Sequence, residues 1–176
     1  MLRILHRVIT TGRLTEPLDT SATLEALGIE VRRTLGKRFA GSFAIRHVDA
    51  GSCNGCELEI HALGNPYHDL ERFGIHFVAS PRHADALLVT GVVSRHMQEA
   101  LLRAYTAMAQ PGLVIAAGAC ACDGGEFGES YASLGAVEHA LPVDVRIPGC
   151  PPTPALLLRG LLAALGREAG AVPISR

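Results

Sequence analysis

The stretch Phe43-Ala-Ile-Arg-His-Val-Asp-Ala-Gly-Ser-Cys-Asn-Gly-Cys-Glu57 joins a strand-like run to a loop that carries two cysteines. Residues 43–48 are mostly apolar, as expected of a buried strand. Cys53 and Cys56 then follow with the spacing CxxC. An apolar run also precedes a Gly–Cys loop at Gly118-Ala-Cys120 and at Pro148-Gly-Cys-Pro151. At all three places, an apolar run thus leads into a glycine-containing loop that carries cysteine.

From residue 43 onward, strand-like runs alternate with helix-like stretches. Strands are expected at 43–48, 75–79, 86–90, 113–117 and 143–147, and helices at about 54–63, 67–73, 94–109, 131–140 and 154–166. The runs at 86–90 and 113–117 are almost entirely apolar, which is typical of parallel strands covered on both faces. This alternation predicts right-handed βαβ units in a doubly wound α/β domain.

The first 40 residues do not show this alternation. Residues 20–39 have the pattern of a helix, whereas residues 1–20 form a tail with Leu2, Leu5 and Ile9 near one helical face and basic side chains around it. Such a segment is either an ordinary arm or a basic amphipathic element that docks on a partner or a membrane surface. We therefore expect an N-terminal arm and helix at 1–40 and an α/β domain at 41–176.

Composition excludes several classes of function. The 176 residues are 48% hydrophobic and 19% charged, but no run approaches the length of an uncharged membrane span. A net charge of −1 and the absence of Trp argue against nucleic-acid binding. A chain this apolar is expected to bury part of its surface against a partner subunit.

The cysteine count and the N-terminus both indicate a reducing compartment. Five cysteines, an odd number, do not suggest a disulfide framework. The N-terminus lacks a continuous apolar core of a signal peptide, and Arg32-Arg33 is not followed by an apolar stretch, so no twin-arginine leader is predicted. We expect a cytoplasmic protein whose thiols are free to bind metal.

Four of the cysteines are expected to meet at one edge of the sheet. Cys53 and Cys56 follow the first strand, Cys120 follows the run 113–117, and Cys150 follows the run 143–147. Parallel sheets place ligand sites at the carboxyl ends of their strands. Four thiolates suit a [4Fe–4S] cluster or tetrahedral zinc. One CxxC with two single cysteines favours the cluster, while zinc and metal-free buried or redox thiols remain as alternatives.

Cys122 is the fifth cysteine and competes with Cys120 as a ligand. The order strand, glycine, small residue, cysteine is shared by Cys120 and Cys53, which favours Cys120. Cys122 is then expected to pack in the interior.

At this point the sequence resembles a known family. The segments that carry the resemblance are Cys53-Asn-Gly-Cys-Glu-Leu-Glu-Ile60, Ser80-Pro-Arg-His-Ala-Asp-Ala-Leu-Leu-Val-Thr-Gly91, Gly118-Ala-Cys-Ala-Cys-Asp-Gly-Gly125 and Pro142-Val-Asp-Val-Arg-Ile-Pro-Gly-Cys-Pro-Pro-Thr-Pro154. They look like the complex I 20 kDa subunit family. That family includes the small subunits of membrane-bound, energy-converting (group 4) [NiFe] hydrogenases and of formate hydrogenlyase. The resemblance covers about residues 43–165.

The resemblance implies a flavodoxin-like α/β fold with one [4Fe–4S] cluster. Carried over by motif, the ligands are Cys53, Cys56, Cys120 and Cys150. The implied function is electron transfer between a ferredoxin-like iron–sulfur subunit and a catalytic large subunit. The complex would also contain membrane subunits, and this chain would lie peripherally on the cytoplasmic face of the inner membrane. No catalytic residue is expected on this chain, and no nucleic acid among its partners.

One departure separates the branches of the family. The complex I branch typically has two adjacent cysteines at the first ligand position, whereas Cys53 and Cys56 are spaced as in the hydrogenase-like branch. We therefore expect a hydrogenase-like complex. The alternatives are a quinone-reducing subunit of the complex I type and a zinc-stabilised assembly subunit without a redox role.

Glu57 and Glu59 directly follow the CxxC motif. Two interpretations stay open: a proton path towards the large subunit, or carboxylates that face a partner or stabilise a helix N-terminus.

Overall fold

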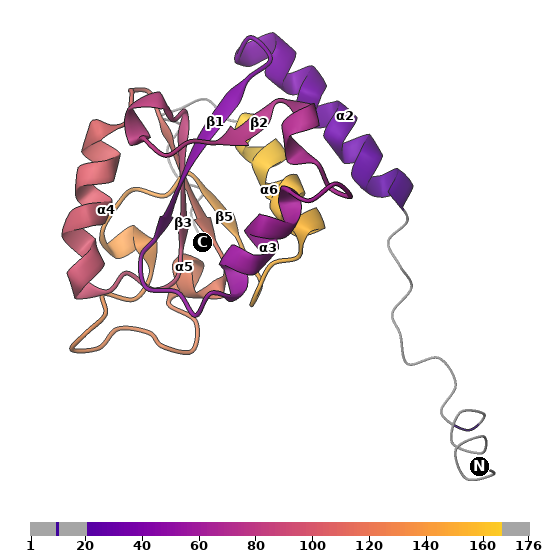
Figure 1. Cartoon of the computed structure of the whole chain (residues 1–176). Helices are drawn as coiled ribbons and strands as arrows, with labels where there is room; N and C mark the ends of the chain where they lie inside the picture. The colour runs from indigo at the N-terminus through magenta and orange to yellow at the C-terminus, as the bar shows by residue number, and fades with distance from the viewer. Residues whose placement is uncertain (1–9, 11–20, 167–176) are drawn as a thin grey trace.

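The computed structural model describes residue 10 and residues 21–166, and the predicted amphipathic segment at 1–20 lies outside them apart from residue 10. A parallel sheet of five strands forms the centre, with helices on both faces (Figure 1). The strands are β1 (Phe43–Asp49), β2 (Ile75–Phe77), β3 (Ala86–Thr90), β4 (Leu113–Ala117) and β5 (Val145–Ile147). The α-helices are α2 (Ser21–Arg38), α3 (Gly55–Leu63), α4 (Arg95–Ala107), α5 (Ala119–Asp123) and α6 (Pro154–Leu165). The 3₁₀ helices are η1 (Leu70–Phe73), η2 (Pro81–His83) and η3 (Val137–His139).

The strand order is β2-β1-β3-β4-β5, and all neighbours pair in parallel. This is the flavodoxin-like order, so the predicted fold class is confirmed. The order reverses between β1 and β3, because the chain first moves outward to β2 and then returns to the other side of β1. Such a switch point leaves a crevice at the carboxyl ends of the two strands, where doubly wound sheets bind their ligands.

Alternation along the strands divides the core into two layers. Phe43 and Ile45 pack with α2, α3 and α6, whereas Leu87 and Val89 pack on the opposite face with α4 and α5. Every residue of β3 and β4 is buried, which confirms that the apolar runs at 86–90 and 113–117 are strands covered on both faces. Helix α2 belongs to this core through Val31 and Leu35, both fully buried.

Two expected helices are wrong in whole or in part. Residues 131–140 contain only η3, because Ser133 within this stretch pairs with Ser94 of the β3–α4 connection. Residues 67–73 shorten to η1, since the Asn65 side chain accepts hydrogen bonds from the backbone of Tyr67 and His68 and holds a turn there. The sequence also did not predict α5.

Within the described part of the chain, no helix combines the length and apolar character that a bilayer crossing requires.

Candidate metal centre

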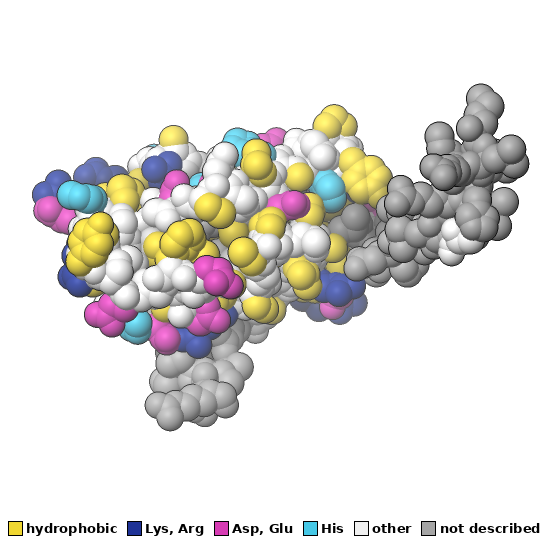
Figure 2. All heavy atoms as spheres, turned by 90° about the horizontal axis from the view of Figure 1, so that it is seen from below, with side chains coloured by type: hydrophobic (Ala, Val, Ile, Leu, Met, Phe, Trp, Pro, Cys, Tyr) yellow, Lys and Arg dark blue, Asp and Glu magenta, His cyan; other side chains and the backbone are white. Residues whose placement is uncertain are grey.

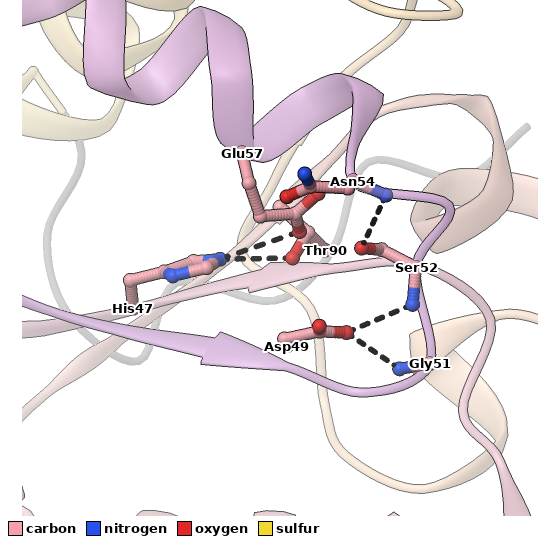
Figure 3. Close-up of polar contacts among 7 residues, drawn as sticks. All are labelled: His47, Asp49, Gly51, Ser52, Asn54, Glu57 and Thr90. Carbon is pink, nitrogen blue, oxygen red and sulfur yellow. Dashed lines mark hydrogen bonds and ion pairs between the residues drawn. The ribbon is translucent and has the colours of Figure 1, made fainter.

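The loop between β1 and α3 is held by hydrogen bonds within itself and to β3. Asp49 Oδ1 accepts from the backbone N–H groups of Gly51 and Ser52, both at 2.8 Å, and Ser52 Oγ accepts from Asn54 N–H at 3.1 Å (Figure 3). Ala50 N–H donates to the carbonyl of Thr90, which ties the loop to the neighbouring strand. The loop that carries Cys53 and leads to Cys56 is therefore fixed at the switch point.

The β4–α5 connection is bonded directly to the loop after β5. Gly118 N–H donates to the carbonyl of Ile147 at 2.8 Å, and Ala119 N–H donates to the carbonyl of Gly149 at 2.7 Å. These bonds bring Cys120 beside Cys150. Cys120 lies inside the five-residue helix α5 and not in a loop, which corrects the sequence-based expectation.

All four predicted cysteines line one small pocket at the carboxyl edge of the sheet. Cys53, Cys56, Cys120 and Cys150 share this pocket with Gly91 of the β3 loop and other small residues. Cys53 and Cys150 are exposed, whereas Cys56 and Cys120 are partly buried. Figure 2 looks at the molecule from below, towards this edge, and hydrophobic side chains are spread over the face.

The thiols of the pocket influence one another electrostatically. Burial raises the pKa of Cys56 to about 12, and the neighbouring Glu57 and the other three pocket cysteines add to the rise. Burial likewise raises the pKa of Cys120, with Cys150 and Cys53 adding to it. Four thiolates cannot gather here without a compensating positive charge, which bound iron would supply.

The backbone beside the pocket leaves room for sulfur. Gly118 has a φ of 92°, and a Cβ at this position would lie 2.5 Å from Cys56 Sγ. Gly91 has a φ of 76°, and its Cβ would lie 2.4 Å from the backbone nitrogen of Ser52. Any other residue at these positions would fill the space in which the Cys53–Cys56 loop lies.

The four thiols are a donor set that an iron–sulfur cluster can use. Among the described residues, no three His, Cys, Asp or Glu side chains converge closely enough to hold one metal ion. In a [4Fe–4S] cluster each thiolate binds a different iron atom, so four thiols around a pocket need not converge on one point.

Cys122 lies apart from this pocket. It is 8% exposed and belongs to the core on the α4 and α5 side of the sheet. Its Sγ lies 3.5 Å from the carbonyl oxygen of Ala116, and burial raises its pKa to about 11. The prediction that Cys122 packs in the interior is confirmed.

Sequence reasoning missed a polar cluster next to the cysteine pocket. Glu57 projects from α3 towards His47 of β1 and Thr90 of β3 (Figure 3). His47 Nε2 lies 2.9 Å from Thr90 Oγ1 and 3.7 Å from Glu57 Oε1. Burial lowers the pKa of His47. The sequence feature that could have indicated this cluster is Thr90, a polar residue at the end of an otherwise apolar strand beside the switch point.

Several large apolar side chains are exposed around this end of the molecule. Leu58 follows the CxxC motif and is 62% exposed, while Phe127 and Tyr131, in the loop after α5, are 62% and 95% exposed. Arg95 holds that loop by donating to the carbonyl oxygens of Ser130 and Tyr131. Exposed apolar side chains of this size are typical of a surface that a partner covers.

The chain is similar in sequence to subunits of hydrogenases and of NADH-quinone oxidoreductases. Formate hydrogenlyase subunit 7 of Escherichia coli K12 is 48% identical over 136 residues, which cover 77% of this chain and 53% of that protein. A probable membrane-bound hydrogenase subunit, mbhJ of Pyrococcus furiosus, is 47% identical over 123 residues, or 70% of this chain and 74% of that protein. A subunit of the NADH-quinone oxidoreductase of Citrifermentans bemidjiense is 50% identical over 107 residues, or 61% and 62%. The chain thus spans about half of the first relative and less than two thirds of the third.

A solved structure shares the fold. A chain of the membrane-bound sulfane sulfur reductase, an archaeal respiratory membrane complex, superimposes with a TM-score of 0.64 at 30% identity, covering 78% of this chain and 75% of that one. The family model described as NADH ubiquinone oxidoreductase, 20 kDa subunit, matches residues 53–164, which include all four pocket cysteines. This chain therefore belongs to the NADH ubiquinone oxidoreductase 20 kDa subunit family.

Proposed function

We propose that the chain is an electron-transfer subunit that holds one [4Fe–4S] cluster through Cys53, Cys56, Cys120 and Cys150. The observation that carries the proposal is the shared pocket of these four thiols at the carboxyl edge of the sheet. When bound, the cluster supplies reversible one-electron transfer. The protein's own contribution is to fix the thiols, to place small residues beside them and to limit their exposure, which tunes the reduction potential.

The cluster would lie next to the catalytic site of a partner large subunit in a membrane-associated, [NiFe]-hydrogenase-like complex. The CxxC spacing and the two hydrogenase-related relatives support this assignment. A ferredoxin-like iron–sulfur subunit would exchange electrons with the same cluster, and membrane subunits would hold the complex at the cytoplasmic face of the inner membrane. The exposed residues Leu58, Phe127 and Tyr131 provide apolar surface for such partners.

A second candidate is a quinone-reducing role of the complex I type. It is favoured by the 50% identity to the NADH-quinone oxidoreductase subunit of Citrifermentans bemidjiense. In that case the cluster would be retained and the partner would bear a quinone site in place of a nickel–iron centre.

Low-temperature EPR of the intact complex, prepared anaerobically, tests the proposal and separates these candidates. We expect a [4Fe–4S]⁺ signal after reduction with H₂ alone and after reduction with dithionite. The Cys150→Ala variant should lose the signal, while Cys122→Ala should keep it. A signal with dithionite only, in a complex with an intact nickel site, would favour the quinone-type role. Absence of acid-labile sulfide, with bound zinc, would refute the electron-transfer proposal.

A further inference from the structure

The loop that follows α5 carries the most exposed large hydrophobic side chain of the described residues. Tyr131 is 95% exposed, and Phe127 in the same loop is 62% exposed. The loop projects below the sheet in Figure 1, on the side where the carboxyl ends of the strands lie. A ring that remains this exposed stabilises the isolated chain very little, although tyrosine is among the residues that contribute most to binding at interfaces.

The backbone beneath Tyr131 is nevertheless held in place. The Arg95 side chain donates to the carbonyl oxygen of Tyr131 at 2.9 Å, and the Arg95 backbone N–H donates to that of Ala132 at 2.9 Å. Further along the loop, Leu134 N–H donates to the carbonyl oxygen of Val93 at 2.8 Å. A ring presented by a fixed backbone loses little conformational entropy when another protein covers it. The loop is thus preorganised for docking.

Every charged side chain between residues 119 and 137 is acidic. These are Asp123, Glu126 and Glu129, and all three residues are exposed. None of them forms an ion pair within the described part of the chain. Arg95 contacts the loop, but its guanidinium donates to backbone carbonyl oxygens and not to these carboxylates. In Figure 2, acidic and hydrophobic side chains adjoin on the left of the face, where this loop lies.

We propose that residues 123–131 form a docking loop for another subunit, which accepts the Tyr131 ring in an apolar recess rimmed by lysine or arginine. The inference rests on the proposed function, because it requires that the chain works within a complex. Asp123 ends α5, the helix that carries Cys120, so the docked subunit would lie beside the cysteine pocket.

Two independent features of the docking loop select this occupant. The exposed ring requires an apolar recess, whereas the carboxylates require positive charge around that recess. A second copy of this chain, docked through the same loop, would bring the carboxylates of both copies together, which like-charge repulsion opposes. An anionic membrane surface would repel the same carboxylates. A basic protein surface with an apolar recess satisfies both requirements.

Tyr131→Ala tests the role of the ring. The experiment measures the dissociation constant between the cluster-loaded chain and a purified complex that lacks this chain. We expect a rise of at least about 10-fold, because the ring is buried only in the complex. The melting temperature of the isolated chain should not change, because the ring is exposed there.

Tyr67→Ala is the matched control for the ring. Tyr67 is 60% exposed and lies between α3 and η1, outside the docking loop, so this variant should bind with the wild-type dissociation constant. An unchanged dissociation constant for Tyr131→Ala, or equal rises for the two variants, would overturn the proposal.

Glu126→Gln combined with Glu129→Gln tests the role of the charge, because it removes both carboxylates and preserves their shape. At low ionic strength the association rate constant should fall at least about threefold, and salt should diminish the difference from wild type. Glu30→Gln combined with Glu71→Gln gives the same change in net charge at exposed positions on α2 and η1, and should leave the rate constant unchanged. Equal falls in both double variants would refute the basic rim.

A photo-crosslinker identifies the occupant. Benzoylphenylalanine in place of Phe127 keeps an aromatic residue at an exposed position of the docking loop. In the intact complex, we expect it to capture a segment of another subunit that contains lysine or arginine. Capture of a second copy of this chain, of lipid or of nothing would contradict the proposal.

The outcomes separate this inference from the proposed function. If the chain carries its cluster and copurifies with partner subunits, but the Tyr131 and Glu126/Glu129 variants bind as the wild type does, the docking loop is refuted alone. If these variants lose binding but the wild-type chain contains neither iron nor acid-labile sulfide, the docking loop stands and the electron-transfer proposal is wrong. If the chain has neither cluster nor partner, both proposals are wrong.

Discussion

Replacing Gly118 with alanine should prevent binding of the proposed cluster without unfolding the protein. The backbone at Gly118 has a φ of 92° and a ψ of 154°, a region that is almost restricted to glycine. Forcing alanine into it costs about 1–3 kcal/mol. A domain of this size has a stability of about 5–15 kcal/mol, so the variant should still fold.

The larger effect of the substitution is on the position of the Cys56 sulfur. The new Cβ would lie 2.5 Å from Cys56 Sγ, whereas ordinary contacts begin at 3.4 Å. The sulfur must therefore retreat by about 1 Å, yet ligand distances at a metal site tolerate only about 0.2 Å. Cys56 lies in the first turn of α3, so its backbone is fixed and the clash is relieved by rotation of its one side-chain torsion, which moves the sulfur out of its present position.

The assay is iron and acid-labile sulfide per chain after anaerobic reconstitution, with circular dichroism as the check on folding. Gly118→Ala should lose most of its iron. Gly125→Ala, whose Cβ would lie 3.0 Å from Cys120 Sγ, should lose less. Gly36→Ala is the matched control, because nothing lies within 4 Å of its Cβ, and alanine in helix α2 should add about 0.5–1 kcal/mol of stability. A folded Gly118→Ala variant with full iron, full sulfide and an unchanged EPR signal would refute the steric argument.

The remaining predictions concern Cys122 and His47. Cys122→Ala should keep full iron and sulfide but lower the free energy of unfolding by about 1 kcal/mol, because it leaves a small cavity in the core. Urea titration measures this loss of stability. A loss of iron would contradict the assignment of Cys122 to packing. The pKa of His47 is lowered by burial, against the opposing effects of Glu57 and Asp49 and with added lowering from Arg46 and His61. Its contribution to stability is therefore complete above the unfolded value of 6.5 and is lost as the pH falls below it, because the unfolded chain then binds a proton that the folded chain resists. His47→Gln should reduce the fall in the urea midpoint between about pH 7.5 and about pH 5.5, and an unchanged fall would refute this role.

The meeting of the cysteines could be predicted from sequence because it depends on topology alone. A parallel sheet brings the ends of β1, β4 and β5 to one edge, whatever the details of the loops. Cys122 lies outside the pocket because residues 119–123 form the helix α5. In α5, Cys120 and Cys122 point to different sides, so only Cys120 lines the pocket while Cys122 packs below. The pattern favoured the cysteine that lines the pocket, although the helix itself was not predicted.

The polar cluster and the loop after α5 could not be predicted, because both depend on contacts between distant segments. Thr90 meets His47 only through the pairing of β1 with β3, and Glu57 reaches them only once α3 lies over β1. In the same way, the composition of residues 131–140 is compatible with a helix. The chain is not helical there because Ser133 pairs with Ser94 and because Arg95 donates hydrogen bonds to the loop carbonyls.

The unfavourable features of the isolated chain are concentrated at one end. Cys56 has a thiol that resists ionisation, Glu57 has a buried carboxylate without donors, and Tyr131 is almost fully exposed. Elsewhere in the described residues, the strands and helices follow the ordinary rules of buried apolar faces and capped helices. Local violations of these rules are retained where function requires them. Here each violation calls for something different: a cationic metal group for the thiols, a hydrogen-bond donor for the carboxylate and an apolar surface for the aromatic side chain. The proposed cluster would compensate the charge of the thiols, and a partner subunit would cover the exposed aromatic side chain.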